Sequence, residues 1–269
     1  MFSPYYARAR KSGPAEPLNH CAMNVCLYGP LRHRWAMTER SGAAVARDAA
    51  TFNVGPSRMS WEGDALTIRL DETANPIPEP IRGVIRLRPE VMTDFTATLD
   101  DAGRHLWRPI APRAHVEVAL DKPALAWRGH GYFDSNFGAE PLEDGFSFWN
   151  WSRAPARGGA AVLYDAVRRE GGRRALALSI DKTGKVERME PPRSARLAPT
   201  MWLMRRETMA DDGCARVEKT LEDTPFYTRS VISGSLFGER VRGMHESLCL
   251  DRFRSAWVQR LLPYRMPRR

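Results

Sequence analysis

The chain has 269 residues, with 41 Lys or Arg against 32 Asp or Glu, so its formal net charge is +9. This excess favours an anionic neighbouring surface, but the arginines are scattered and no basic helix, zinc knuckle or aromatic RNA-binding motif accompanies them, so we expect no nucleic-acid partner. No run of about 18 apolar residues is present to span a bilayer, and the first residues lack the apolar run of a secretory signal. We expect a cytoplasmic protein, soluble or peripheral to a membrane.

Short runs that alternate apolar and polar residues dominate the chain and predict an all-β protein. Strands are expected at residues 65–71 (ALTIRLD), 83–88 (GVIRLR) and 115–120 (HVEVAL). Residues 174–190 predict a hairpin that turns at 181–184, where glycine supplies the positive φ. So many antiparallel strands favour a sandwich or a barrel, and closure into barrels hides the strand edges best.

Three segments rich in proline or glycine predict connections between strands. Residues 74–80 (ANPIPEP) are expected to form a loop, and residues 154–159 (APARGG) and 190–199 (EPPRSARLAP) are typical of linkers. A domain boundary is expected between residues 140 and 160. We place it so that the two domains comprise residues 1–145 and 146–269.

The C-terminal segment, residues 252–269, departs from the β pattern. Phe253, Trp257 and Leu261 follow one another at intervals of four, which predicts a short amphipathic helix that Pro263 ends. Two roles remain open: an interfacial helix on anionic lipid, or a helix that closes a barrel and carries a basic tip. A membrane contact would involve Arg252, Arg254, Trp257 and Arg260.

Several familiar site motifs are absent from the sequence. Residues 129–131 (GHG) begin like a dinucleotide-binding loop, but Asp134 stands at the third glycine position. A calcium loop starting at Asp134 would need a bidentate Glu at the position of Gly145. The six histidines lack metal-site spacing, the four cysteines form no C-x-x-C pair, and Ser235 lacks the nucleophile-elbow spacing. We therefore expect no metal, no cofactor and no covalent nucleophile.

Two short stretches concentrate reactive and aromatic side chains. His105 and Trp107 are separated by one residue, as are Tyr132 and Asp134. On an extended strand such pairs point to the same side, so all four can face one cavity if the strands are neighbours. A carboxyl group among rings has a raised pKa and stays protonated near neutrality, while the rings attract a cation. This arrangement suits protonation of a carbon–carbon double bond. The alternative is that Asp134 caps a turn and the aromatic residues belong to the core.

At these residues the sequence resembles the carotenoid 1,2-hydratases, or hydroxyneurosporene synthases, of purple bacteria. The matching segments are FSPYYARAR, RWAMTER (34–40), GRHLWRPIAPRA (103–114), GHGYFDSNFGAEPLEDGFSFWNWSRA (129–154) and LDRFRSAWVQRLLPYRMPR (250–268). The resemblance implies two lipocalin-like antiparallel β-barrels in tandem and no cofactor, and the helix predicted from residues 252–269 completes this expected fold. It implies a hydro-lyase of carotenoid biosynthesis (the spirilloxanthin pathway) that adds water to the terminal C1=C2 bond of acyclic carotenes such as neurosporene or lycopene.

The family resemblance also implies site residues. Its catalytic positions correspond to His105, Trp107, Tyr132 and Asp134. Our hypothesis is that Asp134 protonates C2, that Trp107 and Tyr132 stabilise the cation at C1, and that His105 orients Asp134 or relays a proton. Three further aromatic residues either line a tunnel for the polyene or belong to the core: Phe146, Trp149 and Trp151.

Two other functions are compatible with these residues. A terpenoid cyclase on the same scaffold would protonate an alkene and capture the cation differently, and a non-catalytic carotenoid or lipid carrier would bind without turnover. Family members usually have a further stretch before FSPYY, which suggests a misassigned start or a missing first strand. A carotene substrate favours a location at the inner or photosynthetic membrane.

Overall fold

A computed structural model describes residues 2–29 and 33–269. The chain forms two compact units, and each unit is discontinuous in sequence. Unit 1 comprises residues 1–89, 114–131 and 259–269, and unit 2 comprises residues 90–113 and 132–258. Strands β7, β9 and β10 and helix α4 therefore contribute residues to both units. The sequence-based boundary between residues 145 and 146 stays a prediction.

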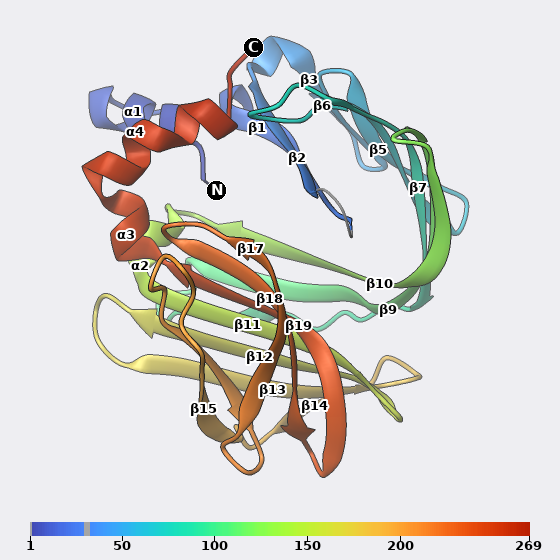
Figure 1. Cartoon of the computed structure of the whole chain (residues 1–269), viewed down its shortest axis with the longest axis vertical. Coiled ribbons are helices and arrows are strands. Elements are labelled where there is room, and N and C mark those ends of the chain that lie inside the picture. Colours follow the sequence, from blue (N-terminus) through green and yellow to red (C-terminus); the bar gives the residue numbers. More distant parts are fainter. Residues whose placement is uncertain (1, 30–32) are drawn as a thin grey trace. The chain divides into compact units, whose positions relative to one another are not determined.

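Unit 1 is built mainly from a meander of short antiparallel strands. Strand β1 pairs with β2. From β3 to β7, each strand pairs with its neighbour in sequence (β3 with β4, β4 with β5, β5 with β6, β6 with β7), because short connections join them (Figure 1). The bounds are α1 Pro4–Ser12, η1 Pro17–His20, β1 Cys21–Tyr28, β2 His33–Arg40, η2 Gly42–Ala44, β3 Val45–Arg47, β4 Thr51–Val54, β5 Ser57–Glu62, β6 Ala65–Thr73 and β7 Pro80–Val91.

Three further strands extend this sheet. They are β8 (Ala97–Thr98), β9 (His105–Lys122) and β10 (Leu125–Gly138). The strand order is β10-β9-β7-β6-β5-β4-β3, with β8 paired to β9. Strand β9 alternates buried and accessible residues over most of its length, as expected for a strand with one face against a core. The sheet order makes β9 and β10 neighbours.

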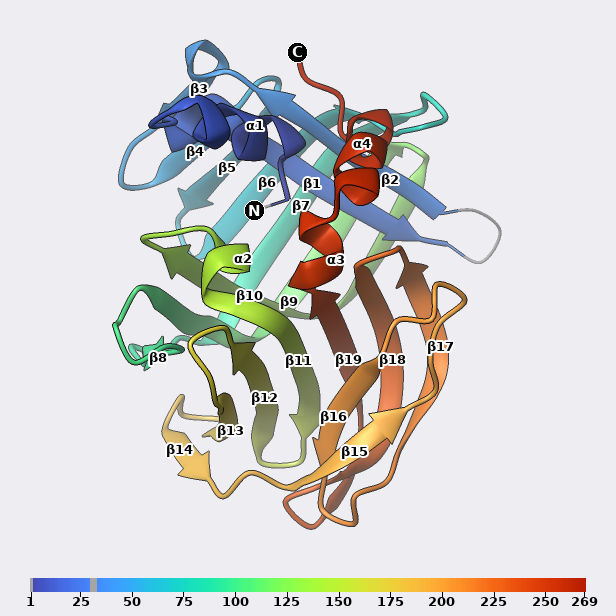
Figure 2. The ribbon, with the colours of Figure 1, turned by 90° about the vertical axis from the view of Figure 1, so that its left-hand side faces the viewer.

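Unit 2 has a second sheet in which the first and last long strands pair. The order is β14-β13-β12-β11-β19-β18-β17, and β15 and β16 form a separate hairpin (Figure 2). Pairing of β11 with β19 brings together residues about a hundred positions apart. The bounds are α2 Leu142–Gly145, β11 Phe146–Ala156, β12 Gly159–Arg168, β13 Arg173–Asp181, β14 Val186–Met189, β15 Arg193–Leu197, β16 Arg206–Ala210, β17 Ala215–Asp223, β18 Tyr227–Leu236, β19 Glu239–Cys249, α3 Leu250–Arg254 and α4 Ala256–Arg265.

The predicted strands are confirmed. Residues 65–71, 83–88 and 115–120 lie in β6, β7 and β9. The predicted hairpin is the β13–β14 pair, and Gly184 in its turn has φ 86°. Residues 74–79 connect β6 to β7, as expected.

The two linker predictions are wrong. Residues 154–156 end β11, and Gly159 begins β12, so the segment 154–159 is a tight hairpin turn. Residues 193–197 form β15, which lies within the second expected linker. The error has a physical cause, because Gly-Gly and Pro-Pro pairs occur both in flexible linkers and in the turns that bound short strands.

The C-terminal helix exists but differs from its prediction. It is interrupted at Ser255, so that α3 and α4 are separate helices, and Pro263 lies inside α4 rather than ending it. A proline in the last turn removes only its own N–H donor, and the Met266 amide still bonds the Leu262 carbonyl at 2.8 Å. The break at Ser255 separates the expected stripe, because Phe253 is buried whereas Trp257 and Leu261 are exposed.

No helix among residues 2–29 and 33–269 has the length and apolar character needed to cross a bilayer.

Candidate active site

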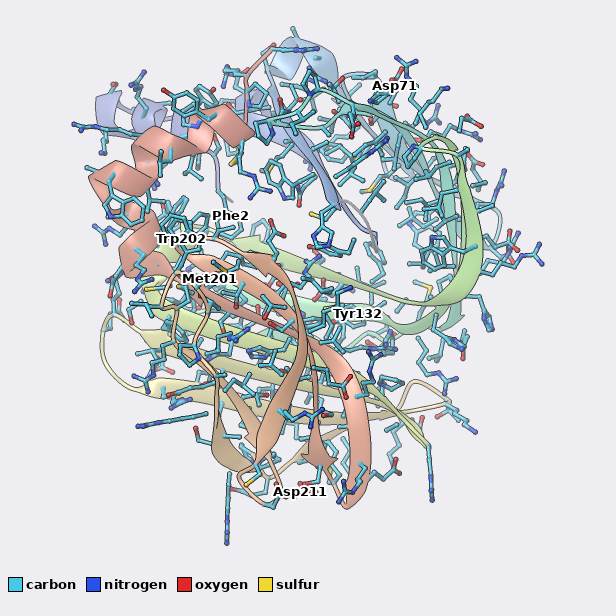
Figure 3. The ribbon with its side chains drawn as sticks, viewed as in Figure 1. Phe2, Asp71, Tyr132, Met201, Trp202 and Asp211 are labelled. Atoms are coloured by element: carbon cyan, nitrogen blue, oxygen red, sulfur yellow. The ribbon has the colours of Figure 1, made fainter. Side chains whose placement is uncertain are left out.

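Asp134 is held by two hydrogen bonds to one of its oxygens. Trp107 on β9 donates its indole N–H to Asp134 Oδ2 at 2.8 Å, and the Tyr132 hydroxyl donates to the same atom at 3.0 Å. Trp107 is completely buried. Tyr132, which Figure 3 labels, and Asp134 occupy alternate positions of β10, so their side chains lie on one face of the strand, as expected from their spacing. All three residues belong to unit 2.

Burial controls the ionisation of this group. Loss of solvent raises the pKa of Asp134, although the hydrogen bonds from Trp107 and Tyr132 oppose that change, and the charge of Glu246 adds to the increase. Burial and the neighbouring Asp134 also raise the pKa of Tyr132 well above its ordinary value, so its hydroxyl keeps its proton. The pKa of Asp134 is therefore shifted in the direction that favours its protonated form.

The two donors distinguish the carboxyl oxygens. Because Oδ2 accepts both side-chain hydrogen bonds, it acts as the carbonyl-like oxygen of a protonated carboxyl. Protonation of this carboxyl would therefore place the proton on Oδ1, while Trp107 and Tyr132 hold Oδ2 in a fixed orientation.

Aromatic rings surround the two donors. The Trp151 ring centroid is 5.3 Å from that of Tyr132, and the Tyr164 centroid is 5.1 Å from that of Trp107. Trp149 extends the cluster, with its centroid 4.6 Å from that of Tyr164. Aromatic rings at these centroid separations attract each other and stabilise the packing. The cluster places several aromatic side chains around a single carboxyl group.

The three predicted substrate-contact residues have different environments. Phe146 is completely buried and Trp149 nearly so, whereas Trp151 is partly accessible. Phe146 packs edge-on against Trp149, with 5.7 Å between centroids. The Trp151 indole nitrogen is buried and has no hydrogen-bond partner among the described residues. The structure thus joins Trp149 and Trp151 to the cluster, with Phe146 packed behind Trp149.

His105 has a different partner from the one we expected. Its Nε2 atom lies 3.3 Å from Glu140 Oε1, and its backbone N–H donates to Asp100 Oδ1 at 2.8 Å. Its ring packs edge-on against Phe146, with 4.9 Å between centroids. The expectation that His105 orients Asp134 is therefore wrong for the described geometry. His105 instead supports the segment that follows β10.

Two glycines explain how closely that segment approaches His105. A Cβ atom on Gly138 would lie 3.0 Å from His105 Nδ1, and one on Gly145 would lie 2.8 Å from His105 Nε2. Both positions require a small residue because the imidazole occupies the adjoining space. The imidazole is thus enclosed by the chain on either side of Glu140.

Tyr164 is a site neighbour that sequence reasoning missed. It lies directly opposite Trp151 in the β11–β12 register, is buried, and donates its hydroxyl to Asn136 Oδ1 at 2.9 Å. A tight turn at residues 157–158 fixes that register. Had residues 154–159 been interpreted as a hairpin, pairing outward from the turn would have placed Tyr164 beside Trp151.

A family model described as "Carotenoid hydratase CrtC" matches residues 1–269 of this chain. The chain belongs to this carotenoid hydratase family. It is 51% identical over 270 residues to the acyclic carotenoid 1,2-hydratase of Thiocapsa roseopersicina, covering 100% of this chain and 67% of that protein. It is 45% identical over 271 residues to the protein of the same name from Cereibacter sphaeroides, covering 100% and 95%. The family resemblance found in the sequence is confirmed.

A solved structure supports the fold of this family member. A Nitrosomonas europaea crystal structure assigned as an AttH matches with a TM-score of 0.57 and 12% identity, over 84% of this chain and 80% of that one. At this identity the likeness concerns the fold alone. The expected all-β, lipocalin-like class is confirmed, and the expected short C-terminal helix is present as two helices, α3 and α4.

Proposed function

We propose that this chain is an acyclic carotenoid 1,2-hydratase, a hydro-lyase that adds water to the terminal C1=C2 bond of an acyclic carotene such as neurosporene or lycopene. Its membership of the carotenoid hydratase family and its 51% identity to a protein of that name support the activity. One observation supports the chemistry: a partly buried carboxyl, Asp134, whose pKa is raised by loss of solvent and whose Oδ2 is bonded by two neutral donors.

The proposed reaction begins at Oδ1 of Asp134. Its proton moves to C2, the π electrons form the new C–H bond, and C1 becomes a tertiary cation. The oxygen of a water molecule then bonds to C1 and releases one proton, which restores the Asp134 carboxyl. The net change is addition of one water to one double bond, so atoms and charge balance without a redox partner.

The aromatic residues stabilise the cation in this proposal. A ring face attracts a cation with about 0.5–2 kcal/mol, and about 1.4 kcal/mol changes a rate tenfold. Trp107 and Tyr132 are the nearest rings to the acid because both are hydrogen-bonded to it. Trp151 contributes a further ring beside Tyr132. Trp149 packs against Tyr164, and Phe146 packs against Trp149, so both support the aromatic cluster from behind.

His105 acts as a positioning residue in this scheme. Its bond to Glu140 and its packing between Gly138 and Gly145 fix the segment that joins β10 to β11. Asp134 precedes that segment and Trp151 follows it, so its geometry affects how β10 and β11 present their side chains. His105→Gln is expected to lower activity less than loss of the acid.

The substitution Asp134→Asn tests the proposed acid. An amide has no proton acidic enough for alkene protonation, so conversion should fall by about 10²–10⁴-fold while the far-UV circular dichroism is unchanged. The measurement is mass spectrometry of pigments from lycopene-producing cells, where the unsubstituted protein should add one or two waters. The matched control is Asp64→Asn, since Asp64 is strongly exposed in unit 1.

Other outcomes of that experiment identify the rival functions. Full activity of Asp134→Asn would remove the proposed acid. A product isomeric with lycopene, lacking oxygen from isotopically labelled water, would show a cyclase. Tight lycopene binding with no product from either protein would show a carrier.

We also propose that unit 2 contacts an anionic membrane through an apolar loop and the neighbouring helices. The loop between β15 and β16 carries Met201, labelled in Figure 3. Met201 and Leu203 are 95% and 72% exposed. Between them, Trp202 stacks on Trp257 of α4 with 6.1 Å between ring centroids. Exposed apolar residues that include tryptophan are typical of surfaces that enter the lipid interface.

Arginines around this loop supply the charge that anionic lipid would attract. Arg252 donates to the Trp202 carbonyl at 2.7 Å and to the Leu203 carbonyl at 3.2 Å, so it also supports the loop. Arg205 is the last residue of the loop, and Arg254 lies two positions beyond Arg252. These residues extend the contact proposed from the sequence, which comprised Arg252, Arg254, Trp257 and Arg260. The membrane would be the inner or photosynthetic membrane, approached from the cytoplasm.

The double substitution Met201→Ser/Leu203→Ser tests the membrane contact. Co-sedimentation with vesicles of phosphatidylcholine and phosphatidylglycerol should weaken by about tenfold or more, because each buried apolar side chain contributes about 1.5–3 kcal/mol. Binding should also weaken with salt and with removal of phosphatidylglycerol. Met92→Ser, at another exposed methionine of unit 2, is the control. Unchanged sedimentation of the double variant would contradict the proposal.

A further inference from the structure

Glu246 shares a sheet face with the rings of the candidate active site. On β19 it lies directly opposite Trp151 of β11, and on its other side it lies opposite Arg229 of β18. Side chains directly opposite in an antiparallel pair are on the same face, with Cβ atoms about 4.5–5.5 Å apart. Glu246 therefore stands one strand away from a site ring, within unit 2.

A short chain of contacts connects this face to Asp134. The Trp151 ring lies 5.3 Å from the Tyr132 ring, centroid to centroid, and the Tyr132 hydroxyl donates to Asp134 Oδ2 at 3.0 Å. Trp151 is thus the immediate neighbour of both Glu246 and the Tyr132–Asp134 pair. This chain of contacts places the Glu246 carboxylate near the acid.

Arg229 holds the Glu246 carboxylate in one orientation. Its Nε and Nη2 atoms lie 2.9 Å and 2.6 Å from Glu246 Oε1. Both side chains are partly accessible, with 30% and 28% exposed. This charge-assisted pair fixes the position of the Glu246 carboxylate on the sheet face.

We propose that Glu246 tunes the candidate acid: its negative charge keeps the Asp134 carboxyl protonated in the resting enzyme, and Arg229 fixes Glu246 in the position from which it does so. This inference rests on the proposed function, in which protonated Asp134 is the active form. Glu246 is a positioning residue in this scheme. Among the site residues named from the sequence, none carries a second negative charge.

Electrostatics gives the sign of this effect. A nearby negative charge disfavours ionisation of a carboxyl group and raises its pKa. The charge of Glu246 acts in this direction on Asp134, and it also helps to raise the pKa of Tyr164. Because burial already raises the pKa of Asp134, the two effects add.

The other groups around Asp134 do not duplicate this role. On β11, Arg153 carries the opposite charge, with its guanidinium carbon 5.8 Å from the Tyr132 ring centroid, and it donates to the Pro112 carbonyl at 2.8 Å. Tyr132 keeps its proton because its pKa is raised. Arg153 therefore opposes Glu246.

The remaining titratable neighbours lie on β9 and β12. His105 on β9 is hydrogen-bonded to Glu140, and Tyr164 on β12 keeps its proton because burial raises its pKa well above the ordinary value. On β18, Arg229 is joined to Glu246 itself. Glu246 is thus the acidic group that the register places on the face shared with Trp151.

The test is the pH dependence of kcat/KM for lycopene hydration. Activity should fall as pH rises through the pKa of Asp134, because the protonated form is consumed. In Glu246→Gln this alkaline limb should move to lower pH, with activity at mildly alkaline pH about three- to tenfold below that of the unsubstituted protein. At acidic pH the two proteins should converge. A loss of folding alone would lower activity at every pH by a similar factor.

Two further variants keep the inference testable if Glu246→Gln folds poorly. Arg229→Gln leaves the Glu246 charge uncompensated, so the alkaline limb should move to higher pH. Glu246→Asp retains the charge and should keep the limb near that of the unsubstituted protein. Opposite shifts from two partners of one ion pair cannot arise from a shared structural defect.

The matched control is Glu218→Gln. Glu218 on β17 also forms an ion pair, with Arg242 Nε of β19 2.6 Å from its Oε2, and the β11–β19 register does not place Arg242 opposite a site ring. Its substitution should leave the alkaline limb in place. An unmoved limb in Glu246→Gln and Arg229→Gln would overturn the inference while the proposed function stands, whereas an active Asp134→Asn would remove the proposed function itself.

Discussion

Asp134 and His245 show how burial acts in opposite directions on an acid and a base. For Asp134, loss of solvent raises the pKa and preserves the proton that the proposed chemistry needs. For His245, which is completely buried, loss of solvent and the nearby Arg206 lower the pKa to about 3, so the imidazole is neutral. In both residues the interior of unit 2 favours the uncharged form.

The neutral His245 has a partner on each ring nitrogen. Ser152 Oγ lies 2.8 Å from Nδ1, and Ser247 Oγ lies 3.0 Å from Nε2. Ser247 in turn donates to Asn150 Oδ1 at 2.6 Å. These bonds satisfy polar groups that would otherwise be costly to bury.

We predict that His245 makes the stability of unit 2 depend on pH. Its folded pKa lies below the ordinary value of 6.5, so the folded state binds fewer protons than the unfolded state in this range. Its contribution is fully present above about pH 6.5 and is lost as pH falls towards about 3. Urea denaturation should show a smaller loss of stability between neutral and mildly acidic pH in His245→Gln than in the unsubstituted protein. His33→Gln, at an exposed histidine of β2, should retain the original dependence.

At the scale of elements, the β11–β12 hairpin sets the register of the site rings. The turn between Ala156 and Gly159 pairs β11 with β12 so that Trp151 is opposite Tyr164. Gly159 also lies against β13, where an added Cβ would come within 1.8 Å of the Ile180 carbonyl oxygen. Only a residue without a side chain fits at this close approach.

Gly159→Ala should therefore destabilise unit 2 by about 1–3 kcal/mol, because the backbone of β12 or β13 must move. Activity should fall as well, since the movement disturbs the strand that carries Tyr164. The neighbouring Gly158→Ala is a close control, because no atom lies within 4 Å of a Cβ placed there. Equal denaturation midpoints for the two variants would show that the contact with Ile180 is relieved without cost.

At the scale of the whole molecule, the chain starts and ends in unit 1. Residues 1–89 and 259–269 both belong to it. The buried Glu39 joins the two ends, since its carboxylate is hydrogen-bonded to Ser3, His20 and Arg268. The backbone adds to this connection, because the Glu39 amide bonds the Pro267 carbonyl at 2.9 Å.

Arg268→Ala should destabilise unit 1 by about 1–3 kcal/mol, because it removes a charged partner from a buried carboxylate. The appropriate comparison is Arg69→Ala, whose pair with Glu62 is about half exposed and should contribute no more than about 1 kcal/mol. Chemical denaturation of both variants measures the difference. If they were equally stable, Glu39 would be satisfied without Arg268.

Local properties of the sequence were sufficient to predict much of this protein. Alternation of apolar residues located the strands, and the spacing of Tyr132 and Asp134 placed both side chains on one face of a strand, because side-chain direction in a strand repeats every two residues. Burial of Asp134 and the direction of its pKa followed from the rings around it. The family resemblance pointed to the same catalytic residues, His105, Trp107, Tyr132 and Asp134.

Only the tertiary structure decided which distant residues meet. His105 bonds Glu140 rather than Asp134, Tyr164 joins the ring cluster, and Glu246 lies opposite Trp151. These pairings depend on turn geometry and on the register between strands, and a shift of one residue reverses every side chain. Alternation within a strand carries no information about that register, so the surroundings of the acid became visible only when the strands were assembled.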